Sequence, residues 1–375
     1  MTTAGPVPYH AGRFPPQQFD WEQLIPLLGP TAAAVARYDG LLAAVPNPAV
    51  LLSPLTTQEA VLSSRIEGTQ ATFDEVLEFE AGGGPGDRAP ERVADIQEVL
   101  NYRQALREAE RMMAELPLCL RVINAAHRKL MDGVRGHSKS PGEFRRVPNW
   151  IGRAGCTIES ARFVPIAAAD LPAAMAAWER YANDKAADRL VQLAVLHAEF
   201  EALHPYLDGN GRLGRLLVPL YLWQSGIIRA PMFYLSAYFE ARRDEYYDRL
   251  LAVSRDGDWT GWCRFFLEAT RNQAEANHKK AGDILELYAS MKPRLHELTH
   301  SQYVVHALDW MFERPIFRSS DFVEAAGIPA PTARRVLRVL QRSNILRAIT
   351  PAGGRRAATL AFPALLNIAE GSRVF

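Results

Sequence analysis

Residues 204–215 read His-Pro-Tyr-Leu-Asp-Gly-Asn-Gly-Arg-Leu-Gly-Arg, and this stretch decides how the rest of the chain is interpreted. Apolar residues recur at helical spacing before it and after it, so we expect an amphipathic helix on each side. Pro205 is expected to end the first helix, because the residue before a proline is disfavoured in the α region. The stretch therefore predicts a helix, a tight loop and a second helix.

The loop is suited to an anion. We expect the backbone N–H groups of Gly209, Asn210 and Gly211 to be free at the start of the second helix, where the helix dipole also favours negative charge. Arg212 and Arg215 are three residues apart and share a helix face. Guanidinium groups bind phosphate oxygens bidentately, so the loop predicts a site for a di- or triphosphate.

Two further side chains point to phosphate chemistry. Asp208 offers a hard oxygen ligand for Mg²⁺, which usually takes one or two carboxylates together with substrate phosphates. His204 can accept a proton near neutral pH. Leu213 and Gly214 complete the candidate nucleotide-binding stretch. The alternative is a plain helix–loop–helix corner, in which Asp and Asn cap a helix and the arginines are solvated.

This stretch resembles the signature of the Fic family, His-Pro-Phe-x-Asp/Glu-Gly-Asn-Gly-Arg-x-x-Arg. It differs only at Tyr206, whose hydroxyl needs a partner if buried. The resemblance implies an all-α fold, with a helical core and a small β-hairpin flap. It also implies a protein adenylyltransferase that uses ATP with Mg²⁺ and transfers AMP to a Ser, Thr or Tyr hydroxyl of a target protein. In that reaction His204 would be the general base.

A second segment resembles the inhibitory helix of the same family, here residues 55–68. Ser63 through Gly68 fits the pattern Ser/Thr-x-x-x-Glu-Gly/Asn. The resemblance implies that Glu67 reaches the nucleotide site and pairs with Arg215, which would remove a contact to the γ-phosphate. Its place before the core implies the N-terminally self-inhibited class. The alternative is a solvated carboxylate near a helix C-terminus.

Residues 143–166 contain small and β-prone residues and predict a β-hairpin with its turn near Gly152 to Gly155. The resemblance implies that this hairpin is the flap, which holds the target by β-augmentation. An ordinary exposed hairpin is the alternative. The residues implied to approach the nucleotide from the flap are Ser160, Ala161, Arg162 and Phe163. Tyr246 resembles a tyrosine that lines the adenine pocket, although a Tyr-Tyr pair on a helix also suits a core.

Residues 300–375 predict three helices followed by a strand–turn–strand, which resembles a winged helix-turn-helix domain. The basic side chains of its third helix and of its wing turn are Arg334, Arg335, Arg338 and Arg342, and Arg355 and Arg356. This face could bind the phosphates of DNA. Winged helices also serve as dimer or protein-docking modules, so fold alone does not decide between these partners.

The predicted domains follow one another along the chain. They are an N-terminal helical region over 1–110, a Fic catalytic core over 111–275, a linker helix over 276–299 and a winged-helix domain over 300–375. Residues 1–20 are rich in proline and predict an extended arm, and residues 82–90 predict a flexible surface loop.

Composition limits the partners. The 375 residues carry a net charge of +1, which favours neither a polyanion nor a membrane as a partner of the whole chain. Three cysteines without a CxxC pattern suggest neither a zinc site nor a disulfide framework. With no signal sequence and no long apolar run, a soluble cytoplasmic protein is expected. The family resemblance implies a homodimer.

Two alternative functions remain open. One is a DNA-binding regulator whose Fic site only senses nucleotide. The other is a Fic enzyme that removes AMP or transfers another phosphate-containing group, as the related Doc branch does. Doc-type loops carry lysine in place of the second glycine, so Gly211 favours nucleotidyl transfer.

Overall fold

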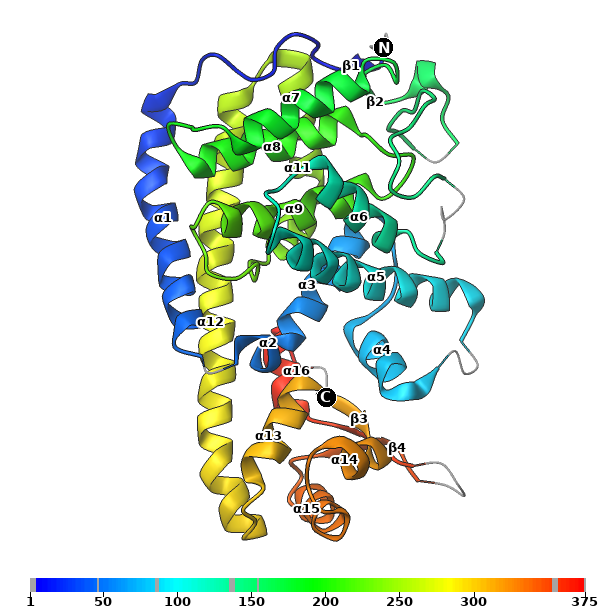
Figure 1. Ribbon diagram of the computed structural model, residues 1–375, viewed down its shortest axis with the longest axis vertical. Helices are drawn as coiled ribbons and strands as arrows, with labels where there is room; N and C mark the ends of the chain where they lie inside the picture. The colour runs from blue at the N-terminus through cyan, green and yellow to red at the C-terminus, as the bar shows by residue number, and fades with distance from the viewer. Residues whose placement is uncertain are drawn as a thin grey trace. The chain divides into compact units, whose positions relative to one another are not determined.

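The computed structural model describes residues 5–45, 47–84, 88–134, 139–153, 155–352 and 357–373, and it is mostly helical (Figure 1). The chain forms two compact units, each assembled from separate stretches. The first unit contains Met1–Arg37, Leu62–Thr69 and Leu100–Glu275, and the second contains Tyr38–Val61, Gln70–Val99 and Ala276–Phe375. Four helices have residues in both: α1 (Trp21–Ala43), α3 (Ser53–Ile66), α5 (Pro90–Met113) and α12 (Trp259–Thr299).

The centre of the first unit is the pair α8 (Arg189–Leu203) and α9 (Asn210–Gln224), which pack against each other. In α8, 13 of 15 residues are buried, and in α9, 12 of 15 are buried. A helix that is buried on nearly every side belongs to a core, so the loop between α8 and α9 starts and ends on fixed elements. Around them lie α6 (Leu120–Leu130), α7 (Leu171–Asn183), α10 (Ser236–Ala241) and α11 (Arg243–Asp256).

The N-terminal arm is more ordered than its proline content predicts. Residues Val7–Pro8 form β1, which pairs in parallel with β2 (Phe163–Val164). Next to β1, the buried His10 contacts Ser254 Oγ at 2.7 Å and Glu199 Oε2 at 2.8 Å. These two partners lie on α11 and α8, so polar contacts fasten the arm to the helical core of the first unit.

The predicted flap hairpin is wrong in its extent. Among the described residues of this segment, one antiparallel bridge forms, between Ile151 and Phe163, with the Ile151 N–H donating to the Phe163 carbonyl at 2.9 Å. A short 3₁₀ helix, η2 (Ile158–Ser160), stands where the second strand was expected to begin. The Thr157 N–H donates to Ser160 Oγ at 3.1 Å. This local side-chain bond competes with strand pairing, which explains the short ladder.

The second unit contains the C-terminal elements. The predicted helices and strands are present as α13 (Val304–Glu313), α14 (Ser319–Ala325), α15 (Ala330–Arg342), β4 (Arg347–Thr350) and β5 (Thr359–Ala361). The sequence did not predict β3 (Ile316–Arg318) or α16 (Pro363–Glu370), and the sheet has the antiparallel order β3-β5-β4. The turn residues Gly353, Gly354, Arg355 and Arg356 lie outside the described residues, as does 85–87 of the loop predicted at 82–90.

The remaining elements of this unit are α2 (Pro48–Leu51), α4 (Phe73–Glu78) and the π-helix η1 (Phe79–Gly83). The expected linker helix over 276–299 is the C-terminal part of α12. Ala281, Ile284, Met291 and Leu295 of this part are buried, so it contributes to the core of the second unit besides connecting the chain. None of the helices in the described ranges has the length and apolar composition that spanning a bilayer requires.

Candidate functional site

The loop between α8 and α9 has the predicted helix–loop–helix form. His204 follows the last residue of α8 in the left-handed region, with φ of 47°, and Gly209 precedes α9 with φ of 77°. The side chain of Asn210 closes the loop: its Oδ1 accepts from the Tyr206 N–H and its Nδ2 donates to the Tyr206 carbonyl, both at 2.8 Å. Asn210 therefore holds the backbone that carries Asp208 and Gly209.

The extra hydroxyl of Tyr206 has the partner that its burial requires. Tyr206 is fully buried, and its hydroxyl donates to Asn124 Oδ1 at 2.5 Å. Its ring stacks on that of His127, with centroids 3.7 Å apart and an angle of 10° between the planes. Asn124 and His127 both lie on α6, so this helix packs against the loop and holds Tyr206 in place.

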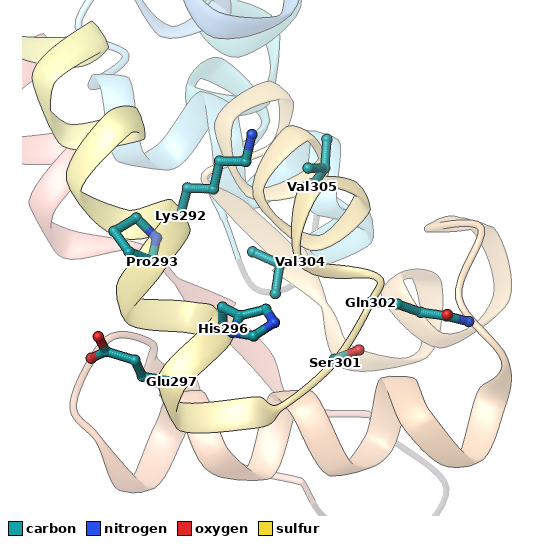
Figure 2. A pocket seen from close by; sticks show the side chains of 8 residues that line it. All are labelled: Lys292, Pro293, His296, Glu297, Ser301, Gln302, Val304 and Val305. Carbon is teal, nitrogen blue, oxygen red and sulfur yellow. The ribbon is translucent and has the colours of Figure 1, made fainter.

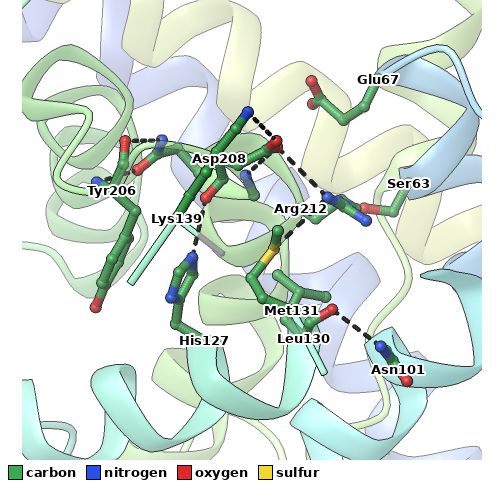
Figure 3. A network of polar contacts seen from close by, with 12 residues as sticks. Ser63, Glu67, Asn101, His127, Leu130, Met131, Lys139, Tyr206, Asp208 and Arg212 are labelled. Atoms are coloured by element: carbon green, nitrogen blue, oxygen red, sulfur yellow. Dashed lines mark hydrogen bonds and ion pairs between the residues drawn. The ribbon is translucent and has the colours of Figure 1, made fainter. Parts of the chain in front are cut away.

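His127 also fixes the loop backbone, as Figure 3 shows. The Gly142 N–H donates to His127 Nδ1 at 2.8 Å, so the proton of the neutral ring lies on Nε2, which donates to the Asp208 carbonyl at 2.9 Å. Burial lowers the pKa of His127 to about 4, which keeps this neutral form at pH 7. The sequence did not reveal His127, because it belongs to an ordinary helix without a motif.

The imidazole of His204 lines a cavity in the first unit. Burial lowers the pKa of His204 to about 4, against the attraction of the nearby Glu67 carboxylate. The ring is therefore neutral at pH 7 and can accept a proton. Arg145, which is 3% exposed, holds the backbone here: its Nε donates to the His204 carbonyl at 3.0 Å and its Nη2 to the Leu203 carbonyl at 3.3 Å.

The amides at the start of α9 are only partly free. The Gly209 N–H donates to Asp208 Oδ1 at 2.8 Å, so the expectation of a free amide is wrong for this residue. Asn210 and Gly211 are the first two residues of α9, where backbone N–H groups have no acceptor within the helix. Gly211 lines the cavity.

Arg215 and Glu67 lie together, as the inhibitory-helix resemblance implies. Arg215 Nη2 is 2.7 Å from Glu67 Oε1, and its Nε and Nη2 donate to Oγ and the carbonyl of Ser63 at 2.9 and 2.7 Å. Glu67 and Gly68 form the turn that ends α3, and Gly68 has φ of 99°. The third nitrogen of the guanidinium, Arg215 Nη1, is buried and has no hydrogen-bond partner.

The Glu67 carboxylate lies directly over the anion loop. A Cβ placed on Gly211 would be 2.1 Å from Glu67 Oε1 and 3.1 Å from Arg215 Nη1. Only a glycine allows both groups to approach the backbone so closely. The carboxylate therefore occupies the space that the free helix end and Arg215 would offer to a phosphate.

The other residues of the stretch have different surroundings. Arg212 is 3% exposed, with Nη2 at 3.7 Å from Asp208 Oδ1 and 3.9 Å from Met131 Sδ, so it contacts elements other than those around Arg215. Leu213 is fully buried. Gly214 lies against Glu201, since a Cβ there would be 2.2 Å from Glu201 Oε1. Leu213 and Gly214 therefore contribute to packing and do not line the cavity.

The cavity has a volume of about 830 Å³, which is within the range of nucleotide-sized ligand sites. Ser160, Arg162 and Phe163 line it, whereas Ala161 is buried beside it. Arg162 forms an ion pair with Asp248. The remaining lining side chains near His204 come from α8 and α11 and include Ala198, Glu201, Ala202, Arg243, Tyr247, Leu250 and Leu251.

The prediction for Tyr246 is wrong. This residue is fully buried, and its hydroxyl donates to His197 Nε2 at 2.9 Å, since His197 Nδ1 faces the Gly214 carbonyl at 3.1 Å. Its neighbour Tyr247 lines the cavity instead. Residues next to each other on a helix point about 100° apart, so the sequence located the helix but not the correct face.

Glu201 is a cavity residue that the sequence did not reveal. It lies one helical turn before His204 on α8, and its Oε1 is buried without a hydrogen-bond partner. Burial, together with the nearby Glu67, raises the pKa of Glu201 to about 8 despite the opposing attraction of Arg215. It is therefore largely protonated at pH 7. Its spacing from His204 was the only available signal.

The donor set at Asp208 fits Mg²⁺. Within the described ranges, no three His, Cys, Asp or Glu side chains gather into a metal cage, and Asp208 is the carboxylate that the loop itself carries. Mg²⁺ commonly takes one carboxylate together with substrate phosphates and water. Asp208 Oδ2 already faces a cation, Lys139 Nζ at 2.9 Å, and the side chain is 34% exposed. Positive charge is thus accommodated at this oxygen.

A second hollow, of about 540 Å³, lies in the second unit near the end of α12 and the start of α13 (Figure 2). Lys292, His296 and Glu297 line it and are exposed. Charged groups that remain solvated gain little from a ligand ion. The cavity beside His204 is therefore the better candidate for a functional site.

Comparison with known families gives two matches. The family described as "Fic/DOC family N-terminal" matches residues 25–111, and the one described as "Fic/DOC family" matches residues 117–222. Together they span half of the chain and include the loop and the Ser63–Gly68 segment.

Curated relatives are distant. A protein named protein adenylyltransferase Fic from Drosophila grimshawi is 27% identical over 165 residues. The match covers 42% of this chain and 30% of that protein, so the chain spans under a third of that relative's length. The protein of the same name from Drosophila yakuba is also 27% identical over 165 residues, with 29% of it covered.

Two solved structures share the fold. The crystal structure of a Fic family protein from Desulfovibrio desulfuricans G20 has a TM-score of 0.57 and 19% identity, and the match covers 93% of this chain and 98% of that chain. A Fic domain containing signaling protein from Bacteroides thetaiotaomicron VPI-5482 has a TM-score of 0.54 and 18% identity, covering 68% of this chain and 97% of that one.

Proposed function

The chain belongs to the Fic/DOC family, and on that premise we propose that it transfers AMP from ATP to a Ser, Thr or Tyr hydroxyl of a target protein. One observation carries the proposal: the neutral imidazole of His204 and the free helix end at Gly211 line the same cavity. A base beside an anion-binding helix end is the minimum that nucleotidyl transfer needs. The names of the Drosophila relatives favour AMP as the transferred group.

In this mechanism the target's hydroxyl oxygen attacks the α-phosphorus of ATP and forms a new P–O bond. The bond from the α-phosphorus to the oxygen that bridges to the β-phosphate breaks, and pyrophosphate leaves with that electron pair. His204 accepts the hydroxyl proton, a role that contributes typically about 10²–10⁴-fold to a rate. The N–H groups of Asn210 and Gly211 donate to phosphate oxygens as charge develops.

The remaining residues bind and orient. Arg215 Nη1, buried without a partner, would donate to an outer phosphate, because an unpaired buried donor gains most from a charged acceptor. Asp208 would hold Mg²⁺, which when bound neutralises charge on the phosphates. Tyr247 offers an aromatic face to the base of the nucleotide. The backbone around Ile151 and Phe163 would hold the target segment by strand addition.

Glu67 would keep the enzyme inactive. Its carboxylate lies over Gly211 and pairs with Arg215, so it both fills the phosphate position and neutralises the cation that a phosphate requires. A triphosphate entering beside this carboxylate meets like charge at short range. Activity would then depend on Glu67 leaving Arg215, while Ser63 continues to hold the guanidinium through Oγ and the carbonyl.

The test is to incubate the protein with α-labelled ATP and Mg²⁺, alone and with a cell lysate, and to measure protein-bound label. We expect weak labelling by the wild type and at least tenfold more by Glu67→Gly. The double variant Glu67→Gly/His204→Ala should give none. Calorimetry should show tighter ATP binding to Glu67→Gly than to the wild type, because Arg215 becomes available.

Glu67→Gln is the matched control, since it keeps the shape of the side chain and removes its charge. If Glu67→Gln is labelled more than the wild type but less than Glu67→Gly, part of the inhibition comes from the charge of Glu67 and part from the space that its side chain occupies. If none of the variants gives protein-bound label although ATP binding is demonstrated, the proposal of AMP transfer is contradicted. Release of AMP from a modified protein by the wild type would favour the AMP-removing alternative.

A further inference from the structure

Positive charge is concentrated in one segment of this nearly neutral chain. Between Glu324 and Glu370 there is no Asp, Glu, Lys or His, but there are seven arginines: Arg334, Arg335, Arg338, Arg342, Arg347, Arg355 and Arg356. This segment therefore carries +7, and the rest of the chain carries −6 against a total of +1. A solvated surface normally mixes both signs, so such separation indicates a polyanionic partner for this segment.

The structure places five of these arginines on the surface of the second unit. Arg334, Arg335, Arg338 and Arg342 on α15 and Arg347 on β4 are all exposed. None of the five forms an ion pair or side-chain hydrogen bond with another residue of the described ranges. The opposite face of α15, with Ala333, Val336, Leu337 and Leu340, is buried. The helix is thus fixed by its apolar face and presents its arginines outward.

The arrangement of α14 and α15 favours double-stranded DNA as the ligand. It follows α14 after a four-residue turn, Ala326–Pro329, in which Gly327 has φ of 68°, and the two helices pack on each other. Two short helices joined by a three- or four-residue turn containing glycine, with the second helix exposed, form the helix-turn-helix arrangement that inserts its second helix into the major groove. The antiparallel strands β4 and β5 follow α15 directly.

The composition argues against single-stranded nucleic acid. Proteins that bind single strands stack the bases on aromatic side chains. From Ala325 to Ala361 the sequence contains no Phe, Tyr or Trp. The deep, narrow major groove of A-form RNA does not admit a helix, whereas the major groove of B-DNA does. An arginine-only face also provides bidentate contacts to phosphates and to guanine.

We infer that the exposed face of α15, with Arg347 of β4, is a binding site for double-stranded DNA. The arginines neutralise backbone phosphates, and the two in the first half of α15, Arg334 and Arg335, also lie where a recognition helix approaches base edges. This inference does not depend on AMP transfer, because none of these residues belongs to the cavity beside His204.

The experiment titrates the full chain into a fluorescent 30-base-pair duplex and follows anisotropy at several salt concentrations between 50 and 200 mM. We expect the logarithm of the affinity to fall linearly with the logarithm of salt, with a slope of about −0.9 for each neutralised phosphate. The variant Arg334→Gln/Arg338→Gln should bind at least tenfold more weakly at low salt. Its slope should be smaller by about 2, because two contacts are lost.

The control removes the same amount of charge elsewhere. Arg37→Gln/Arg107→Gln alters two exposed arginines on α1 and α5 and should leave both affinity and slope unchanged. Circular dichroism checks that all variants keep their helices. A wild type that does not bind the duplex at 50 mM salt would overturn the inference. So would equal weakening by the two double variants, or tighter binding to single-stranded RNA of the same length.

Discussion

At the scale of residues, two side chains of the site are uncharged for the same reason. His204 and Glu201 lie one turn apart at the end of α8, and burial disfavours the charged form of each. A neutral imidazole can accept a proton, and a neutral carboxylic acid does not repel a phosphate. The cavity therefore has a protonation state suited to the proposed substrate, ATP, over a limited pH range.

This range predicts a bell-shaped pH profile. His204 becomes a base above its pKa of about 4, and Glu201 gains a charge above its pKa of about 8. We expect kcat/KM of Glu67→Gly to rise with the first ionisation and to fall with the second. The alkaline fall should lie somewhat below pH 8 in this variant, because Glu67 no longer raises the pKa of Glu201.

Glu201→Gln in the same background should remove the alkaline fall and leave the acid rise in place. The acid rise should lie below pH 4, because Glu67 no longer raises the pKa of His204 either, so the measurement is kcat/KM between pH 3 and 10 with saturating Mg²⁺. Persistence of the alkaline fall in Glu201→Gln would mean that another group controls it.

The sequence predicted the motif residues better than the residues that hold the motif in place. The His204–Arg215 stretch and Ser63–Gly68 were visible because several chemically rare residues occur close together. His127 and Asn124 lie some 80 residues before the loop on a helix of ordinary composition, and only the folded chain brings them to Tyr206. The hydroxyl of Tyr206 did imply a buried partner, although it could not say which residue supplies it.

At the scale of elements, the C-terminus of α8 is held mainly by the side chain of Arg145, with a longer contact from Asn149 Nδ2 to the His204 carbonyl at 3.5 Å. The last carbonyl groups of a helix have no N–H donor within the helix. Arg145 donates to the carbonyls of Leu203 and His204, and also to the carbonyl of Ile166. Arg145 thereby connects the helix end that carries the base to the segment that follows β2.

Arg145→Met should therefore lower the free energy of unfolding by about 4 kcal/mol, since four hydrogen bonds of about 1 kcal/mol each are lost, the fourth being to the Val147 carbonyl. It should also reduce AMP transfer, because the backbone of His204 loses its support. Urea denaturation and labelling measure the two effects. The neighbouring Arg146, whose side chain is 87% exposed, is the control, and Arg146→Met should change stability by less than about 0.5 kcal/mol. Equal effects of the two substitutions would contradict this role.

Helices were easier to predict than the flap. The apolar periods around α8, α9 and α15 are long, and burial enforces them. In the described part of the flap, Thr157 and Ser160 form a local hydrogen bond and β1 pairs with one edge of β2, which leaves the Ile151–Phe163 bridge as the antiparallel pairing. A competition between local and long-range hydrogen bonds of similar energy cannot be resolved from composition.

At the scale of the whole molecule, the sequence predicts four consecutive domains, whereas the packing produces two units from interleaved stretches. Hydrophobic periodicity describes each helix but does not say which distant helix it will pack against. Within the second unit, α2 packs on α13, and the Arg318 guanidinium lies against Gly82. Lys280 Nζ donates to Gln58 Oε1 at 2.7 Å and to the Ala369 carbonyl at 2.6 Å.

A fragment of residues 276–375 should therefore be less stable than the same residues in the full chain. It lacks the stretches 38–61 and 70–99 of its unit, and with them buried side chains such as Leu52 and Val76. We expect a lower urea midpoint and weak near-ultraviolet circular dichroism for the fragment. Cooperative unfolding at the midpoint of the full chain would show that these stretches are dispensable.

The interleaving has a consequence for how such a protein can be rearranged. A module encoded by one continuous length of gene can be transplanted to another host protein as a cassette. The second unit is encoded in three pieces, and the Ser63–Gly68 segment of the first unit lies between two of them. Swapping the arginine-bearing C-terminus for a homologous one would therefore leave a mismatched surface on α2 and α4, and a working chimera would have to exchange all three pieces together.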